Sequence, residues 1–364
     1  MMLQARLKKK LQNFTLEASF TLPSGITALF GPSGSGKTML VKLLGGLEQP
    51  DEGEITLTSK SLYKKTVDRK AEVNLPSHKR SIGFVFQDHR LFPHMSVLGN
   101  LKYGIQKDSS GTNTVLIEDV IELLDLTTLL HRKPKDLSGG ESQRVAIGRA
   151  LLSAPDILIM DEPLSSLDRV RKEDILRLIE RVRDQFDQTI LYITHSMDEV
   201  LHLADNLILI DQGSIKAHGP LMETLSRQDL FPLAGEMDAG TVFAGKVTSH
   251  DFDYNITTIE SDAGPVFVTG VRQTKIGDNV RIRLRARDIA LSTTKHSDIS
   301  MLNQFNGVIT EFRDHTPGVV LVTIDTGLTL FAAITLKSKQ ALELEVGSDV
   351  WALVKSVTVD SVER

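Results

Sequence analysis

The chain has 364 residues, of which 41% are hydrophobic and 24% are charged, and its formal net charge is −5 at pH 7. This length predicts two or three domains, and the negative charge argues against nucleic acid as a main partner. Because cysteine is absent, the composition excludes disulfides, thiolate metal sites and a cysteine nucleophile, and it fits a reducing compartment. We expect no signal peptide and no membrane span, since no apolar stretch approaches the about 20 residues that cross a bilayer.

The first part of the chain, to about residue 230, is predicted to be an α/β domain with a parallel sheet. Residues 5–11 and 14–22 resemble a short antiparallel pair, and strand and helix patterns then alternate. Four apolar runs are continuous rather than alternating, which indicates strands buried on both faces. Each run stops at a polar residue, and ligands in such sheets sit at the carboxyl ends of the strands. The four runs are residues 26–30, 82–86, 157–160 and 190–194.

Residues 31–38, which follow the first run, read GPSGSGKT and match the phosphate-binding pattern G-x-x-x-x-G-K-[ST]. Glycines let backbone N–H groups surround phosphate oxygens, and the N-terminus of the next helix adds partial positive charge. Lys37 is expected to reach the β- and γ-phosphates, and the Thr38 hydroxyl to bind Mg²⁺. The flanking strand and helix favour this site over a plain Gly/Ser turn. The pattern therefore predicts a nucleoside triphosphate bound by Gly31, Pro32, Ser33, Gly34, Ser35, Gly36, Lys37 and Thr38.

Two carboxylates follow the apolar run at residues 157–160. Asp161 suits a contact to Mg²⁺ across from Thr38, and Glu162 is aimed at the γ-phosphate, where it can act as a general base. An Asp-Glu pair after a strand is also an ordinary pair of charges at a helix N-terminus. Its functional interpretation therefore depends on the phosphate-binding loop.

A second glycine-rich turn, residues 137–144 with the sequence LSGGESQR, leads into a helical pattern. Ser138, Gly139 and Gly140 can form another anion-binding helix N-terminus, but no phosphate-loop lysine accompanies it. A cradle without its own lysine makes sense if it completes the site of a second copy. That interpretation predicts a twofold homodimer with two nucleotides between the copies. A plain N-capped helix is the alternative.

Six motifs in order resemble those of the ATP-binding cassette (ABC) ATPases, over residues 26–196. They are Walker A at 31–38, Gln87 of the Q-loop, the signature at 137–144, Walker B at 157–162, the D-loop ending at Asp168, and the switch histidine His195. The resemblance implies that Gln87 senses Mg²⁺ and couples to a membrane partner, that His195 contacts the γ-phosphate, and that Asp168 bridges two ATP sites. The implied catalytic residues are Glu162, His195 and Gln87, and the implied ligands of Mg²⁺ are Thr38, Gln87 and Asp161. The implied fold is an α/β P-loop ABC ATPase domain over residues 1–230, with a helical subdomain at about 88–153. Apolar residues spaced by three and four over residues 115–130 themselves predict helix there.

From about residue 235 the hydrophobic period changes to two, which predicts an all-β domain over residues 235–364. Three short segments, which begin at Ala244, Ser261 and Ile276, recur further along with offsets of 62, 63 and 70 residues. They predict two OB-like repeats, at about residues 241–295 and 300–362. Coincidental Gly-Asp turns, which are common in any β domain, are the alternative.

The C-terminal extension favours an importer subunit among the ABC proteins. A chromosome or repair ATPase would need a long coiled coil between Gln87 and Ser138, and the 51-residue separation leaves no room for one. A translation-type protein would carry two cassettes, and an exporter subunit would normally lack the β domain. Residues 86–104, 196–205 and 303–359 resemble the ATP-binding subunits of molybdate importers, whose C-terminal module is called Mop or TOBE.

This resemblance implies an ATP-hydrolysing subunit that lies peripherally on the cytoplasmic face of the inner (plasma) membrane. Its implied partners are a second copy, a dimeric transmembrane permease that docks near residues 87–103, and a periplasmic or extracellular solute-binding protein that acts through the permease; no nucleic acid is expected. Importers of sulfate, iron, sugar or polyamine stay open as alternatives, as does a soluble ABC ATPase outside transport.

The resemblance also implies molybdate as a regulatory ligand of the C-terminal domain. Such modules hold an oxyanion with backbone N–H groups, hydroxyls and a cation. Thr335, Lys355 and Ser356 are the candidate residues. The module often has arginine where this chain has Leu302, so the alternative is that the domain only holds a dimer together.

Overall fold

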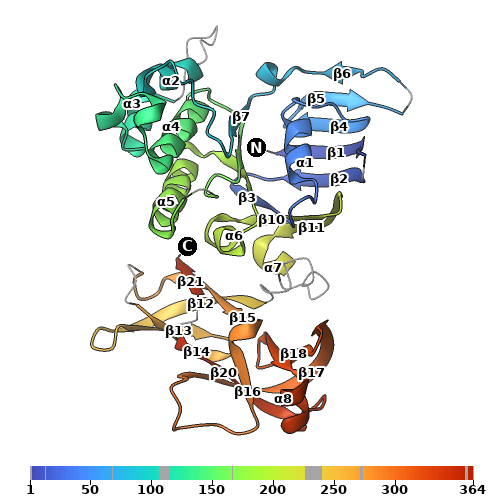
Figure 1. The fold of residues 1–364 in the computed structure, drawn as a ribbon, viewed down its shortest axis with the longest axis vertical. Coiled ribbons are helices and arrows are strands. Elements are labelled where there is room, and N and C mark those ends of the chain that lie inside the picture. The colour runs from blue at the N-terminus through green and yellow to red at the C-terminus, as the bar shows by residue number, and fades with distance from the viewer. Residues whose placement is uncertain are drawn as a thin grey trace. The chain divides into compact units, whose positions relative to one another are not determined.

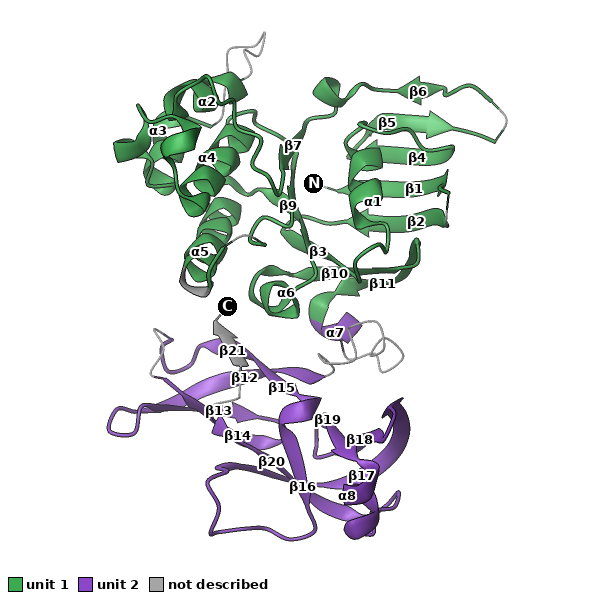
Figure 2. Ribbon diagram, viewed as in Figure 1, with its two compact units in different colours: residues 1–221 green, residues 222–364 purple. Residues whose placement is uncertain are grey.

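The computed structural model describes residues 2–12, 14–67, 69–105, 115–165, 167–225, 240–270, 274–356 and 360–363. The chain forms two compact units, Met1–Leu221 and Met222–Arg364 (Figure 2). The predicted boundary between residues 230 and 235 falls in the segment 226–239, which lies outside the described residues. Among the described residues, no helix is both long and apolar enough to span a membrane.

The first unit is built on one sheet with the strand order β6-β5-β4-β1-β2-β11-β10-β3-β9-β8-β7 (Figure 1). Strands β10, β3, β9, β8 and β7 pair in parallel, whereas β1 pairs antiparallel with β2 and β4. The predicted antiparallel pair at the start of the chain and the predicted parallel sheet are therefore confirmed. The strands are β1 Leu3–Lys10, β2 Thr15–Leu22, β3 Ile26–Phe30, β4 Glu52–Leu57, β5 Lys60–Lys65, β6 Val73–Asn74, β7 Ile82–Val85, β8 Ile157–Asp161, β9 Thr189–Thr194, β10 Asn206–Asp211 and β11 Ser214–Pro220.

The parallel strands separate two hydrophobic clusters, because successive side chains of a strand point to opposite faces. On β8, Leu158 and Met160 belong to one cluster, and Ile157 and Ile159 belong to the other. The first cluster includes residues of the helices α2 to α5, and the second includes α1. Both faces of the central strands are thus covered, which explains their continuous apolar sequences.

The helical subdomain predicted after Gln87 is present (Figure 1). One detail of that prediction is wrong: the helix expected over residues 115–130 ends at Leu123, because Asp125 takes a left-handed backbone with φ 50° and a 3-10 turn over Thr127–Leu129 follows. The helices of the first unit are α1 Lys37–Leu44, α2 Val97–Gly104, α3 Ile117–Leu123, α4 Gly139–Leu151, α5 Arg169–Phe186 and α6 Met197–Leu203, with α7 Leu221–Leu225 at the boundary.

The described part of the second unit consists of two five-stranded sheets around one shared hydrophobic core, so the predicted all-β fold is confirmed. Their strand orders are β14-β13-β12-β15-β21 and β19-β18-β17-β20-β16. The strands are β12 Gly240–Asp251, β13 Ile256–Ser261, β14 Gly264–Thr269, β15 Asn279–Arg285, β16 Ile289–Ser292, β17 Asn303–Thr316, β18 Val319–Asp325, β19 Thr329–Thr335, β20 Asp349–Val354 and β21 Asp360–Glu363, and the helix is α8 Leu336–Ala341.

The two sheets of the second unit exchange their last strands. Strand β16 follows β15 along the chain but pairs with β20, and β21 follows β20 but pairs with β15. A β-bulge interrupts the pairing between Val247 and Ser249 on β12, and another between Ile309 and Glu311 on β17. The sheets therefore share strand order and bulge position.

Arg80 holds the C-terminus of α1, the helix that follows the phosphate-binding loop. Its side chain is buried, and Nη1 donates to the carbonyl oxygens of Leu43 and Leu44 at 2.9 and 2.8 Å. These are carbonyls at the end of a helix, which have no partner within the helix. Its Nε donates to the carbonyl oxygen of Leu75 at 2.8 Å. Arg80 thus satisfies buried backbone groups from two segments.

Arg80→Met is expected to lower the free energy of unfolding by about 3 kcal/mol, because the carbonyl groups of Leu43, Leu44 and Leu75 each lose a hydrogen bond from a buried charged donor. Urea denaturation of the variant and the parent protein measures this difference. Lys79→Met, which changes an exposed neighbour, is expected to stay within about 0.5 kcal/mol of the parent. Equal effects of the two substitutions would show that the carbonyls do not depend on Arg80.

Candidate functional site

The sheet brings four of the predicted motifs to one edge. Strands β3, β9, β8 and β7 are parallel neighbours, and their carboxyl ends are nearly level because Phe30 pairs with Thr194, Asp161 with Ile193, and Val85 with Met160. The residues that follow each strand therefore begin at the same edge. They are the phosphate-binding loop, His195, Glu162 and the segment of Gln87.

The phosphate-binding loop is closely packed at its base and open at its tip. A Cβ on Gly31 would lie 2.1 Å from the carbonyl oxygen of Ile210, so only glycine fits there. Gly36 has φ 107° and caps α1 in the left-handed conformation that favours glycine. Pro32, Ser33 and Gly34 are exposed, and a Cβ on Gly34 would meet nothing within 4 Å. The exposed tip leaves room for phosphate oxygens.

Lys37 lies folded over this loop. Its Nζ donates to the carbonyl oxygens of Gly31 and Pro32 at 2.6 and 2.9 Å, and its side chain is buried. Burial lowers the pKa of Lys37, while the negative charges of Glu162 and Asp161 act in the opposite direction. Three charged groups from two motifs are thus close enough to influence each other.

The hydroxyls of Thr38 and Ser35 differ in exposure. Thr38 is exposed in the first turn of α1, where a hydroxyl can bind a metal ion. The Ser35 Oγ is buried and has no hydrogen-bond partner among the described residues. Buried polar atoms usually have a partner. An exposed hydroxyl, the Asp161 carboxylate and a lysine form a donor set that fits a Mg²⁺–triphosphate complex.

The carboxylates at the end of β8 have different surroundings. Burial raises the pKa of Asp161, the charge of Glu162 raises it further, and Lys37 opposes both effects. Glu162 has a left-handed backbone with φ 45°, and its N–H donates to the carbonyl oxygen of Ile193 at 3.0 Å. Its Oε1 lies 3.3 Å from Nδ1 of His195, whose side chain is 58% exposed. The structure thus brings Glu162 and His195 together facing solvent.

A buried carboxylate supports the segment of His195. The Glu199 Oε2 accepts hydrogen bonds from the hydroxyls of Thr194 and Tyr192 at 2.6 and 2.9 Å, and its Oε1 lies 3.5 Å from Nζ of Lys172. The N–H of Ser196 donates to the Thr194 hydroxyl at 3.0 Å. Burial and the charge of Glu199 raise the pKa of Tyr192 well above its ordinary value. The residues on both sides of His195 are therefore fixed by one network.

Sequence reasoning missed this network. The only sequence signal is Ser196-x-x-Glu199, which is the pattern of a capping box. The Ser196 hydroxyl does accept from the Glu199 N–H at 3.4 Å, but the carboxylate is bound by Tyr192 and Thr194. The pattern identifies the start of a helix, but it does not indicate that the Glu199 carboxylate is buried and bound by Tyr192 and Thr194.

The second glycine-rich turn begins α4 with a full capping box. The Ser138 Oγ accepts from the Glu141 N–H at 3.3 Å, and the Glu141 carboxylate accepts from the Ser138 N–H at 2.6 Å. This last bond lowers the pKa of Glu141. Gly139 is exposed and Gly140 is buried, and a Cβ on Gly139 would lie 3.4 Å from Leu167. The signature thus packs beside the D-loop.

Asp168 begins α5, where its carboxylate accepts from the Arg171 N–H at 3.1 Å and lies 3.4 Å from the Arg171 guanidinium. Gln87 follows β7 and is exposed. Among the described residues, no hydrogen bond or ion pair joins Ser138, Gly139 or Gly140 to the phosphate-binding loop. Among the described residues of one chain, the loop and the signature are therefore separate in their polar contacts.

The three oxyanion candidates do not meet within one chain. Thr335 ends β19 and pairs with Val319, which pairs with Thr316 at the end of β17. Lys355 and Ser356 follow β20, whose Val354 pairs with Asn303 at the start of β17. Within one chain the length of β17 therefore separates Thr335 from Lys355 and Ser356, and the oxyanion site stays a prediction.

Ser356 instead belongs to a structural contact. Asn303 is buried, its Nδ2 donates to the Ser356 Oγ at 3.3 Å and to the Phe267 carbonyl at 3.0 Å, and its Oδ1 accepts from the Phe267 N–H at 2.7 Å. Lys355 and Thr335 are exposed, and the Thr335 hydroxyl caps α8 by accepting from the Ser338 N–H. Asn303 therefore ties β17 to β14 and to the residue after Lys355, a role that sequence reasoning missed.

Comparisons with known proteins agree with this geometry. The ABC transporter family model matches residues 16–165, and the TOBE domain model matches residues 299–360. The molybdenum import ATP-binding protein ModC of Mesorhizobium japonicum is 44% identical over 352 residues, which cover 96% of this chain and 94% of that protein. Its namesake in Paramagnetospirillum magneticum is 41% identical over 359 residues, 98% of each chain.

Solved structures resemble the first unit. The cbiO1 protein of Clostridium perfringens, part of the ABC transporter complex cbiONQ, has a TM-score of 0.52 and 25% identity over 63% of this chain and 92% of that chain. The ADP conformation of an ATP-binding cassette of an ABC transporter has a TM-score of 0.51 and 26% identity over 61% of this chain and 92% of that chain. This chain is an ABC ATPase and belongs to the family of the molybdenum import ATP-binding proteins ModC, with a C-terminal TOBE domain.

Proposed function

We propose that this chain is the ATP-hydrolysing subunit of a molybdate importer and that it energises a separate permease. The observation that carries the proposal is the group at the carboxyl edge of the sheet, where Glu162 lies 3.3 Å from His195 and within electrostatic reach of Lys37. The full-length similarity to molybdenum import proteins supports the choice of solute.

In the proposed reaction, the backbone of residues 31–36 and the ammonium of Lys37 bind the phosphates of ATP. Thr38, Asp161 and Gln87 would hold Mg²⁺, which would neutralise the charge on the β- and γ-phosphates. Glu162 orients a water molecule that attacks the γ-phosphorus, and it accepts the proton of that water. The bond between the γ-phosphorus and the bridging oxygen breaks, so that ADP and phosphate leave, and His195 contacts the γ-phosphate. The 3.3 Å distance between Glu162 Oε1 and His195 Nδ1 supports a shared role of the two side chains.

We propose that the active form is a twofold homodimer. Ser138, Gly139 and Gly140 of one copy complete the ATP site of the other, and Asp168 bridges the two sites. The separation of the signature from the loop within one chain supports this arrangement. ATP binding then closes the pair, and hydrolysis reopens it.

The membrane partners follow from this assignment. The subunit would lie peripherally on the cytoplasmic face of the inner membrane, below a dimeric permease that receives solute from a periplasmic or extracellular binding protein. Its docking surface is proposed at residues 87–103, where Tyr103 is 64% exposed and its ring lies 4.5 Å from that of Phe92. Aromatic side chains of this kind are common at interfaces.

For the C-terminal domain we propose two OB-like repeats, about residues 241–295 and 300–362, which their shared strand order supports. Molybdate as a regulatory ligand of Thr335, Lys355 and Ser356 would require residues of two chains, because β17 separates them within one chain. The alternative for this domain remains that it only holds the dimer together.

Elemental analysis of cells tests the proposed solute. Cells whose sole copy carries Glu162→Gln, grown on limiting trace metals, are expected to lose molybdenum selectively, with sulfur and iron unchanged. Glu122→Gln, the same chemical change on an exposed face of α3, is the matched control and should leave molybdenum at its normal level. A selective fall in iron or sulfur would overturn the molybdate assignment and keep an importer.

A further inference from the structure

The turn after Gln87 contains two successive residues in a conformation that side chains disfavour. His89 and Arg90 have φ 56° and 45°, in the left-handed region. Non-glycine residues adopt this region at a cost in free energy unless their surroundings hold them there. Within the turn, the N–H of His89 donates to the Phe86 carbonyl at 3.0 Å and that of Arg90 to the Asp88 carbonyl at 2.6 Å. The direction of the chain after Gln87 depends on this turn.

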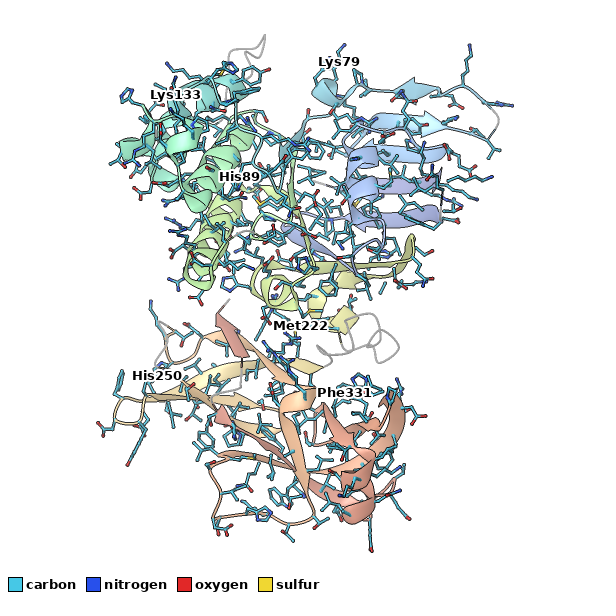
Figure 3. The ribbon with its side chains drawn as sticks, viewed as in Figure 1. Lys79, His89, Lys133, Met222, His250 and Phe331 are labelled. Atoms are coloured by element: carbon cyan, nitrogen blue, oxygen red, sulfur yellow. The ribbon has the colours of Figure 1, made fainter. Side chains whose placement is uncertain are left out.

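Arg149 of α4 binds both carbonyl groups of the turn. Its Nη2 donates to the carbonyl oxygen of His89 at 3.1 Å, and its Nη1 donates to that of Arg90 at 2.7 Å. The planar guanidinium presents parallel N–H groups that suit two successive acceptors. His89, which is labelled in Figure 3, thus belongs to a turn that is fastened to α4 by one side chain.

We call the two hydrogen bonds from Arg149 to the carbonyls of His89 and Arg90 the clamp. The helix residue that carries it is closely packed. A Cβ on Gly104, the last residue of α2, would lie 2.1 Å from the carbonyl oxygen of Arg149, so the two helices approach each other at this residue. The guanidinium carbon also lies 5.2 Å from the ring centroid of Phe92. Burial lowers the pKa of the His89 imidazole, and the charge of Asp88 opposes this effect. The backbone of Arg149 is therefore held in place by its packing against α2.

We infer that Arg149 is a positioning residue: by binding the carbonyls of His89 and Arg90 it holds the strained turn and so sets the place of Gln87 at the nucleotide site. The inference rests on the proposed role of Gln87. Because α4 begins at the signature, the clamp also links the helix that faces the second copy to the segment that follows β7. Gln87 would then respond to a shift of α4.

Arg149→Met tests this role, since it keeps the length of the side chain and removes the donors. We expect the turnover number for ATP to fall about tenfold, with the KM for ATP within about twofold, because hydrogen bonds from a charged group are lost without a change at the phosphate loop. The turnover number of Arg149→Lys should lie between those of the parent protein and Arg149→Met, since an ammonium group carries the charge but lacks the planar pair of donors. Arg183→Met is the control, because the Arg183 guanidinium pairs with its neighbour Asp184 on α5.

A second substitution separates positioning from general damage to α4. Glycine adopts the left-handed region without a steric cost. The double variant Arg149→Met/His89→Gly should therefore recover about threefold or more of the lost turnover. Without such recovery, or with a loss confined to KM, the inference is overturned.

Hydrogen exchange provides a readout that does not depend on turnover. In the full-length, nucleotide-free protein, Arg149→Met should speed exchange of the amides of residues 86–92 about tenfold, since the turn opens more often. Unchanged exchange would show that Arg149 does not hold the turn. Faster exchange with normal ATP turnover would show that the turn does not set the position of Gln87. If the parent protein itself does not hydrolyse ATP, the proposed function is refuted. This result would be known before any variant is compared, so it cannot be confused with a failure of the role of Arg149.

Discussion

Glu162→Gln is expected to lower the turnover number for ATP by about 10²–10⁴-fold while ATP still binds. The carboxylate follows β8 at the carboxyl edge of the sheet and lies 3.3 Å from Nδ1 of His195. Glutamine has the same size and can still orient a water molecule, but its amide cannot accept the proton that the water loses. The loss should therefore appear in the chemical step, which single-turnover hydrolysis measures separately from equilibrium ATP binding.

The same variant has a second expected property. Because ATP is bound and not cleaved, the copies should remain together, and light scattering with ATP should give the mass of a dimer. Glu122→Gln, on the exposed side of α3, should dissociate after hydrolysis like the parent protein. Normal turnover of Glu162→Gln would refute the assignment of Glu162 as the base.

Lys37→Ala is expected to weaken ATP binding by about a hundredfold, which is the size of effect that lost hydrogen bonds from a charged group produce. The ammonium already lies in the loop, where it donates to the carbonyls of Gly31 and Pro32. Its buried position means that little water screens its attraction for phosphate. Equilibrium binding of ATP, followed by titration calorimetry, measures the loss.

Lys42→Ala is the matched control for Lys37→Ala, because it removes the same charge from the last turn of α1, where the side chain is exposed. A change within about threefold is expected there, since water and salt screen an exposed charge. If both alanine variants bind ATP equally well, the lysine of the loop does not contact phosphate, and the site itself is misassigned.

The parallel sheet was predictable because its determinants are local. Residues 26–30 and 190–194 are mostly apolar, and the structure buries every residue of β3 and β9. Strands of this kind need helices on both faces, and the motifs at their carboxyl ends then share one edge. The grouping of Lys37, Asp161 and Glu162 follows from that rule alone.

The network around Glu199 was not predictable, because it depends on which face of α6 packs against β9. Glutamate in the first turn of a helix usually reaches back to its own helix start. Here a buried tyrosine hydroxyl at position 192 and a threonine at 194 offer stronger partners. Tertiary packing decides the direction of the side chain, and no spacing in the sequence expresses it.

In the C-terminal domain, too, contacts between distant segments could not be predicted from the sequence. Its alternating strands were predictable, but the exchange of β16 and β21 between the sheets joins segments that lie far apart in the chain. Thr335 and Ser356 were grouped from resemblance, whereas the register of β17 with β18 and β20 places them at opposite ends of a strand. Register is a property of the pairing, not of either strand alone.

Uptake into proteoliposomes tests whether this chain drives the import of molybdate. The chain would be reconstituted with its permease, with ATP and Mg²⁺ inside and the binding protein with molybdate outside. We expect molybdate accumulation that requires internal ATP, is lost with Glu162→Gln and is unaffected by an equal concentration of sugar or polyamine. ATP hydrolysis that drives the uptake of a different solute, with molybdate left outside, would refute the assignment to molybdate import.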